Sequence, residues 1–207
     1  MSELPPFNPL DKRNLAESIV KALLKQEPIS LPPRRFEGAG IYLIYYRGDF
    51  PAYAPLAKVN KKKWIWPIYL GKAEPKGARK GDGVETESGT KLHERICEHA
   101  ESIQSVTSSL KISDFACRWL AVDDVFIRLG ERLLIARYRP VWNVIVDGFG
   151  NHPVGKGRNE GRRPQWDILH SGRAWADRLR ADSSVEHVST KIAHHFSLHQ
   201  PHAGEFE

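Results

Sequence analysis

Two aromatic segments that each join a tyrosine to a glycine constrain the fold of this chain more than any other feature. Residues 40–46 read GIYLIYY, and residues 64–71 read WIWPIYLG. β-Branched and aromatic residues favour strands, and a glycine allows a second backbone or a ligand to approach closely. The two segments therefore predict two short strands, which are either ordinary core strands or strands that carry a site.

The net charge, the cysteine content and the length of the apolar runs narrow the class of protein. The 207 residues include 31 Lys and Arg against 25 Asp and Glu, a net charge of +6 that permits nucleic-acid binding without requiring it. The two cysteines, Cys97 and Cys117, form no CxxC motif and suit a reducing compartment. No apolar run is long enough to span a membrane, and the first residues lack a secretory signal. We therefore expect a cytoplasmic protein.

The chain divides into an arm, a core and an extension. Residues 1–37 form the N-terminal arm, with a helix that starts near Asn8 and a proline-rich linker after it. Residues 38–145 form the core, interrupted by a polar, turn-prone insertion at 47–63 and by a glycine- and lysine-rich loop at 72–90. The basic faces of these segments are either simply solvated or placed against phosphates.

Three charged or polar side chains fall on helices of the core. A helix that begins at Thr90 places Arg95 and His99 four residues apart, so they share a face. A strand is predicted at 115–122, and the helix after it carries Glu131 near its apolar face. A carboxylate in that position is costly without a partner or a metal. Glu131 is therefore a candidate ligand.

The last part of the chain, residues 146–207, is predicted to be a basic extension. An extended segment at 142–145, which contains Asn143, leads into it. Residues 166–175 predict a turn followed by a helix, and the remaining histidine-rich tail is interpreted as solvated. His195 and His199 could share a helix face that binds a metal, but no carboxylate or cysteine accompanies them in a motif.

The order of these elements resembles the GIY-YIG nuclease domain. Gly40-Ile41-Tyr42 matches the first motif of that family, and Tyr69-Leu70-Gly71 matches the second with leucine in place of isoleucine. The helical arginine, the later helical carboxylate and the closing asparagine also match, over roughly residues 38–145. The gap between the two motifs is longer than usual, because residues 47–63 are inserted. The resemblance implies an α+β fold with a small three-stranded antiparallel sheet flanked by helices.

The resemblance is greatest to GIY-YIG type II restriction endonucleases that read GC-rich palindromes. It implies hydrolysis of double-stranded DNA at a specific site, with one Mg²⁺ ion per active site bound by Glu131. Arg95 would clamp the phosphate, although it could instead pair with Glu94 or Glu98. Two other readings stay open, a repair or mobile-element nuclease and a DNA-binding module that has lost catalysis.

Two assignments of the general base are open. In the first, Tyr42 accepts the proton of the attacking water, although its ordinary pKa of about 10 leaves little phenolate at neutral pH. A nearby cation would favour the phenolate, or Tyr42 would pass its own proton to His99 or Tyr69. In the second, His99 is the base and Tyr42 orients the water. Asn143 either positions the site or is purely structural.

Basic residues outside the catalytic set are predicted to contact DNA, some at base edges and some at phosphates. A palindromic target implies a homodimer on DNA, with its contact in the N-terminal arm or in the 47–63 insertion. The predicted DNA-binding residues are Lys72, Lys76, Arg79, Lys80, Lys156, Arg158, Arg162, Arg163 and Arg173.

Overall fold

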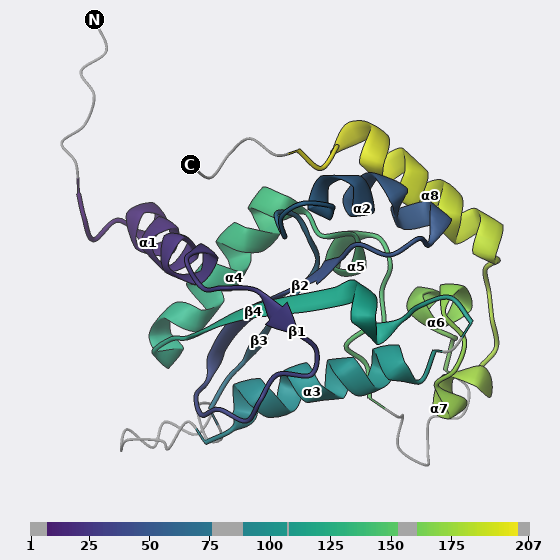
Figure 1. Ribbon diagram of the computed structural model, residues 1–207, viewed down its shortest axis with the longest axis horizontal. Coiled ribbons are helices and arrows are strands. Elements are labelled where there is room, and N and C mark those ends of the chain that lie inside the picture. Colours follow the sequence, from purple (N-terminus) through teal and green to yellow (C-terminus); the bar gives the residue numbers. More distant parts are fainter. Residues whose placement is uncertain (1–7, 76–88, 107, 153–160, 203–207) are drawn as a thin grey trace, which may run out of the picture.

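The protein is built on one antiparallel sheet of four strands in the order β1-β4-β2-β3 (Figure 1). The computed structural model describes residues 8–75, 89–106, 108–152 and 161–202. The α+β class and the three predicted strands are confirmed, and a two-residue strand from the linker is added at one edge. The strands are β1 (Ile29–Ser30), β2 (Gly40–Tyr46), β3 (Pro67–Ala73) and β4 (Phe115–Ala121).

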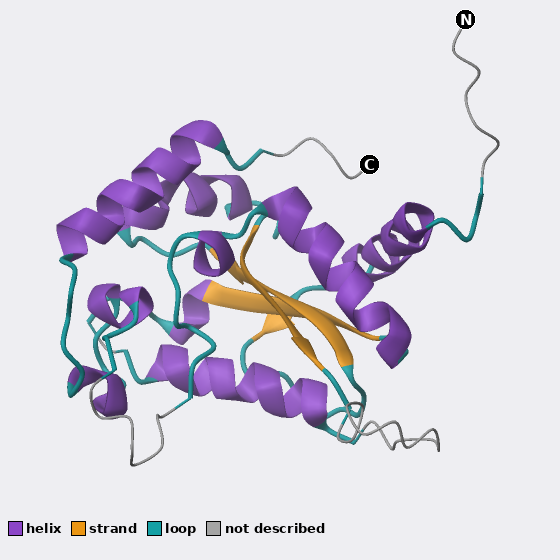
Figure 2. Cartoon of the chain, turned by 180° about the vertical axis from the view of Figure 1, so that it is seen from behind, coloured by secondary structure: helices purple, strands orange, loops and turns teal. Residues whose placement is uncertain are grey.

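Helices cover both faces of the sheet (Figures 1 and 2). Helix α3 packs on β2 and β3 from one side, while α4 packs on the same strands from the other side and also against α1. None of the helices in the described part of the chain is long and apolar enough to cross a membrane. The helices are α1 (Lys12–Leu24), η1 (Pro51–Tyr53), α2 (Ala54–Asn60), α3 (Lys91–Gln104), η2 (Ile112–Asp114), α4 (Asp124–Tyr138), α5 (Val141–Val144), α6 (Gln165–Leu169), α7 (Ala174–Asp177) and α8 (Val185–Leu198).

Strand β2 is the centre of the core. All seven of its residues are buried, because β3 and β4 flank it and helices lie on both faces. On the α4 face, Gly130 leaves just enough room for Ile41, since a Cβ at Gly130 would lie 3.1 Å from the Ile41 Cδ1 atom. This two-sided cover explains why residues 40–46 form a continuous apolar run instead of alternating with polar residues.

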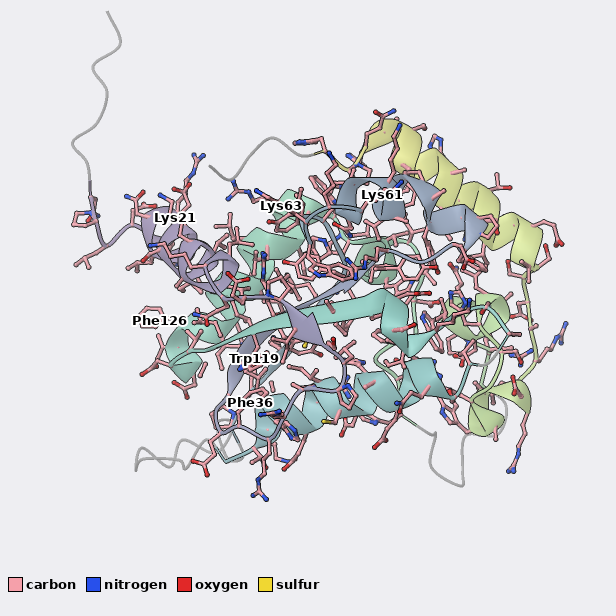
Figure 3. All side chains as sticks on the ribbon, in the orientation of Figure 1. Lys21, Phe36, Lys61, Lys63, Trp119 and Phe126 are labelled. Atoms are coloured by element: carbon pink, nitrogen blue, oxygen red, sulfur yellow. The ribbon has the colours of Figure 1, made fainter. Side chains whose placement is uncertain are left out.

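The N-terminal arm is fixed to the sheet. Helix α1 starts later than expected from Asn8, because the Asp11 side chain caps it by accepting a hydrogen bond from the Arg13 amide. After β1, the ring of Phe36 stacks on Trp119 of β4 with centroids 4.3 Å apart (Figure 3). The arm therefore shares the core of the sheet.

The 47–63 insertion is an ordered piece of the fold, not the turn-prone polar segment that its composition predicts. It forms η1 and α2, and the fully buried Asn60 ties its end to the neighbouring strands. The Asn60 amide donates to the carbonyls of Tyr46 and Trp66 at 2.9 and 2.8 Å, and its oxygen accepts from the Ile65 and Trp66 amides. One buried side chain thus satisfies four backbone groups and closes the insertion.

Two expectations for the C-terminal part of the chain are wrong. Residues 142–145 are not extended, since α5 spans Val141–Val144. The histidine-rich tail is not solvated up to residue 198, because α8 packs on η1 and α6 and buries Val188, Ile192 and Phe196. His195 is also buried, with its Nε2 atom 3.0 Å from the Arg139 carbonyl. Apolar residues at helical spacing outweigh the polar composition here.

A buried polar network joins the insertion, the core and the extension. Trp142 donates through Nε1 to the Tyr53 hydroxyl at 2.8 Å, and that hydroxyl lies 2.8 Å from His170 Nε2. The other ring nitrogen of His170 lies 2.8 Å from the Ser109 hydroxyl. A neutral imidazole with its proton on Nδ1 satisfies all of these groups.

This network makes the stability of the protein depend on pH. Burial lowers the pKa of His170 to about 3, whereas an unfolded histidine binds a proton near pH 6.5. Below about pH 6.5 the unfolded chain therefore binds the extra proton, and we expect His170 to cost about 1.4 kcal/mol of unfolding free energy per pH unit as the pH falls. Urea denaturation at about pH 7 and about pH 5 measures the slope. A His170→Gln slope equal to wild type would contradict this origin, and the exposed His187→Gln is the control.

Candidate active site

The paired tyrosines of the two sequence motifs meet at the β3 edge of the sheet, under helix α3. The Tyr42 hydroxyl lies 2.6 Å from Nε2 of His99, and both side chains are buried. The Tyr69 ring meets the His99 ring edge-on, with centroids 5.0 Å apart, and lies 6.3 Å from the Tyr42 ring. The structure therefore brings together three of the residues singled out in the sequence.

Gly71 makes this arrangement possible. It lies opposite Tyr42 in the ladder between β2 and β3. A Cβ on Gly71 would lie 2.2 Å from the Tyr42 hydroxyl oxygen, closer than any side chain could tolerate. The glycine of the second motif therefore lets the tyrosine of the first motif lie across the neighbouring strand.

Burial sets the charge states of the tyrosine–histidine pair. It raises the pKa of Tyr42 well above 10, an effect that the neighbouring Tyr69 strengthens and the Arg95 cation opposes. Burial and then Arg95 lower the pKa of His99 well below its usual value. The pair is therefore a neutral phenol and a neutral imidazole near pH 7. The Arg95 cation alone does not offset the effect of burial on Tyr42, and the 2.6 Å contact is a hydrogen bond between the phenol and the imidazole.

Arg95 lies beside this pair at the rim of a cleft. Its Nη2 atom donates to the Gly150 carbonyl at 2.8 Å, and its Nη1 atom donates to Glu98 at 2.8 Å and contacts His152. Of the two helix neighbours considered as alternative partners, Glu98 pairs with Arg95. The cleft has a volume of about 290 Å³ and is lined by Lys72, Ala73, Glu74, Lys91, Glu94, Arg95, Glu98 and His152.

Glu131 has the partner that its position on an apolar helix face requires. Its Oε2 atom lies 2.8 Å from Nζ of Lys72, at the end of β3, and Lys72 is also 3.5 Å from Glu74. Burial raises the pKa of Tyr69, and the negative charge of Glu131 adds to this rise, so Glu131 lies near Tyr69. Lys72 was expected to contact DNA, and its pairing with Glu131 was not anticipated, although it directly follows Gly71 in the second motif.

Glu131 also has the chemistry to hold a hard cation. A carboxylate oxygen beside Lys72, which lines the cleft, suits Mg²⁺, which usually keeps several waters and takes few protein ligands. Among the residues that the structure describes, no group of three histidine, cysteine or carboxylate side chains is placed to hold a metal. Glu131 therefore fits the part of one protein ligand to a hard cation.

Asn143 holds the strand that carries Tyr69. Its amide nitrogen donates to the Leu70 carbonyl, and its amide oxygen accepts from the Leu70 amide, both at 2.8 Å. Leu70 lies between Tyr69 and Gly71, so the two bonds fix the backbone of the second motif from α5. This is the geometry of a residue that positions the site.

We expect Asn143→Ala to lower the free energy of unfolding by about 2 kcal/mol. Two backbone groups of Leu70 lose their partners, and an unsatisfied buried group costs roughly 1–3 kcal/mol. The midpoint of urea denaturation measures the loss. Asn143→Asp is the paired variant, because it keeps an acceptor for the Leu70 amide but directs an oxygen at the Leu70 carbonyl. A change below about 0.5 kcal/mol for Asn143→Ala would show that the two bonds contribute little.

A loop that the sequence reasoning missed completes the site. A Cβ on Gly150 would lie 3.0 Å from both the Arg95 Nη2 atom and the Tyr69 hydroxyl. The ring of Phe149 stacks on His99 with centroids 4.5 Å apart and an angle of 17°. The alternation Gly148-Phe149-Gly150 just after α5 is the signal that could have indicated a close approach of backbone to the site.

The predicted DNA-binding residues have different environments. Arg162 is exposed beside Asp182, and Arg163 pairs with Asp177. The expectation of a DNA contact does not fit Arg173, whose side chain is 5% exposed and paired with Asp167 at 2.6 Å. Lys76, Arg79, Lys80, Lys156 and Arg158 lie outside the described residues.

Comparison with known proteins identifies the family of the chain. The model of the Eco29kI GIY-YIG domain matches residues 34–196, which include the whole tyrosine cluster and most of α8. A search of curated proteins gives no significant match to the chain. The family match covers well over half of the chain. The protein therefore belongs to the family of the Eco29kI GIY-YIG domain, a family of type II restriction endonucleases, and is a GIY-YIG nuclease.

Proposed function

We propose that the protein is a Mg²⁺-dependent type II restriction endonuclease that hydrolyses phosphodiester bonds of double-stranded DNA. The observation that carries the proposal is the Tyr42 hydroxyl at 2.6 Å from a neutral His99, in one cluster with Arg95 and Glu131. Hydrolysis needs an activated water and neutralised phosphate charge, and these four side chains offer both.

The proposed reaction uses the tyrosine–histidine pair to move one proton. The Tyr42 hydroxyl takes a proton from the attacking water as it gives its own to Nε2 of His99. The water oxygen forms a bond to phosphorus while the bond to the leaving oxygen breaks. The leaving oxygen takes a proton from solvent, and His99 returns its extra proton to solvent. Because Tyr42 is covered in the free protein, DNA binding has to open a path for water to its hydroxyl.

The charged side chains act on the phosphate. Arg95 offers planar donors that suit two phosphate oxygens, and its bond to Glu98 orients the guanidinium. A Mg²⁺ ion held by Glu131 would supply Lewis-acid stabilisation of the phosphate charge. Lys72, released from Glu131, would then face the same cleft as Arg95. We propose one ion per active site.

The proposed target is a GC-rich palindrome cut by a homodimer. The support is the family relationship and the affinity of arginine for guanine in the major groove. Arg162 is the leading base-reading candidate among the described residues, since it is the most exposed of the predicted arginines there. We propose the 47–63 insertion or the N-terminal arm as the dimer contact, because a two-fold site needs two subunits.

Plasmid cleavage tests the proposal. The protein is incubated with supercoiled plasmid DNA and Mg²⁺, with EDTA in a parallel reaction. Discrete fragments that appear only with Mg²⁺ are the expected result. Nicks confined to junctions or lesions would instead indicate a repair nuclease, and binding without cleavage would indicate a DNA-binding module. Sedimentation of the protein with a target duplex should show two subunits per site.

A further inference from the structure

Arg173 is buried in the C-terminal extension with its guanidinium directed entirely at oxygen atoms. Its Nε and Nη2 atoms donate hydrogen bonds to the two carboxylate oxygens of Asp167 at 2.7 and 2.6 Å. Nη1 donates to the carbonyls of Phe149 and Asn151 at 3.0 and 3.3 Å, and Nη2 donates to the Gly148 carbonyl at 2.9 Å. These five bonds account for all five N–H groups of an arginine.

The carbonyls that Arg173 holds belong to the loop that touches the catalytic cluster. Within residues 148–151, the Gly150 carbonyl accepts from Arg95 at 2.8 Å, and the Phe149 ring lies nearly parallel to the ring of His99. Arg173 binds the residues on both sides of Gly150. The loop is therefore fixed at three carbonyls by Arg173, and it also contacts Arg95 and His99.

We propose that Arg173 is a positioning residue for the cleavage reaction, which acts through the 148–151 loop on the guanidinium of Arg95 and on the ring plane of His99. The inference rests on the proposed nuclease function. Arg173 touches neither DNA nor the reacting atoms in this role. It replaces the DNA contact that the basic composition of the extension had predicted for this residue.

The chemistry of the contact requires arginine. A planar fork with donors on three nitrogens reaches a carboxylate on one side and three carbonyls on the other, whereas the ammonium of lysine has three donors on one atom. The rings of Trp166 and Trp175 lie 4.5 and 4.9 Å from the guanidinium carbon and restrict its movement. Buried ion pairs contribute little net stability and some are retained for a specific geometry. Here that geometry is the path of the loop.

Arg173→Lys tests the proposal, because it keeps a cation and most of the volume. We expect the single-turnover rate constant to fall roughly 10- to 100-fold, since a misplacement of about 1 Å at a catalytic group can cost about a hundredfold. The dissociation constant for DNA should change less than about threefold. Hydrogen exchange in residues 148–151 of the free protein should increase.

Tyr53→Phe is the matched control. It disturbs the polar network around His170 in the same part of the core but makes no bond to the 148–151 loop. Both variants are assayed at the same interval below their own melting temperatures. Equal rate losses in the two variants would overturn the proposal, because they would show that only general destabilisation matters.

A second variant tests whether Arg173 acts through the 148–151 loop. Gly150→Ala places a methyl group 3.0 Å from Arg95 Nη2 and disturbs the same loop directly. Its rate loss should combine with that of Arg173→Lys less than multiplicatively, and fully multiplicative losses would contradict a shared path. If the wild-type protein cuts no DNA, the nuclease proposal fails alone, and hydrogen exchange still decides: unchanged exchange at 148–151 in Arg173→Lys would overturn the positioning role.

Discussion

Replacing Tyr42 by phenylalanine should lower the single-turnover cleavage rate about a thousandfold while DNA binding persists. The substitution removes the hydroxyl that lies 2.6 Å from His99, and general acid–base groups contribute about 10²- to 10⁴-fold. Binding should persist because the buried hydroxyl carries no charge that would hold the phosphates of the duplex. Quenched-flow cleavage and a mobility-shift titration on the same duplex measure the two quantities.

Tyr45→Phe is the control for this prediction. Tyr45 is a buried tyrosine on the same strand, and its hydroxyl accepts a bond from Arg118 at 3.2 Å, away from the cluster. Its loss should leave cleavage within about threefold of wild type. Cleavage near the wild-type rate by Tyr42→Phe, together with complete loss in His99→Gln, would instead make His99 the base.

Replacing Glu131 by glutamine should also reduce Mg²⁺-dependent cleavage about a thousandfold. Metal-ion stabilisation of transition-state charge amounts to several kcal/mol, and about 4 kcal/mol corresponds to that factor. The fold should be largely unaffected, because the ion pair that is lost with Lys72 is partly exposed and such pairs contribute little. Cleavage rates across a Mg²⁺ titration and a thermal melt measure both effects.

Glu74→Gln separates metal binding from simple loss of a charge near Lys72. Glu74 also pairs with Lys72, at 3.5 Å, and lines the same cleft. If the proposed role of Glu131 is right, Glu74→Gln keeps most of the activity at saturating Mg²⁺. Equal losses in the two variants would argue that the charge of the cleft, not a ligand at Glu131, is what the reaction needs.

Local patterns in the sequence single out Tyr42, Tyr69 and His99, which the structure brings together. Arg95 and His99 fall on one face of a helix by their spacing alone, and the glycine of each motif marks where backbone or side chain comes close. The position of Glu131 on an apolar helix stripe predicts a partner for its carboxylate, and that partner is Lys72. Each of these inferences depends on residues within one helix or one strand.

The contacts that the sequence did not reveal are those between distant segments. Nothing in the composition distinguishes Arg173, which is buried against Asp167, from Arg162, which is exposed. The four bonds of Asn60 likewise depend on where two strand ends meet. Burial decides whether a charged or polar residue serves the surface or the interior, and burial is a property of the assembled chain.

In the free protein, both charged groups of the site are already paired within the chain. The Gly150 carbonyl takes a donor of Arg95, and Lys72 neutralises Glu131. In the proposed reaction, a phosphate and a cation would each have to displace an internal partner, so either one alone would gain less than its gross interaction energy. Their binding is mutually assisted, since a phosphate that draws Lys72 away frees the carboxylate for the cation. Under the proposed function, the resting protein would discriminate against free divalent cations and isolated phosphates, and would respond to the two arriving together on DNA.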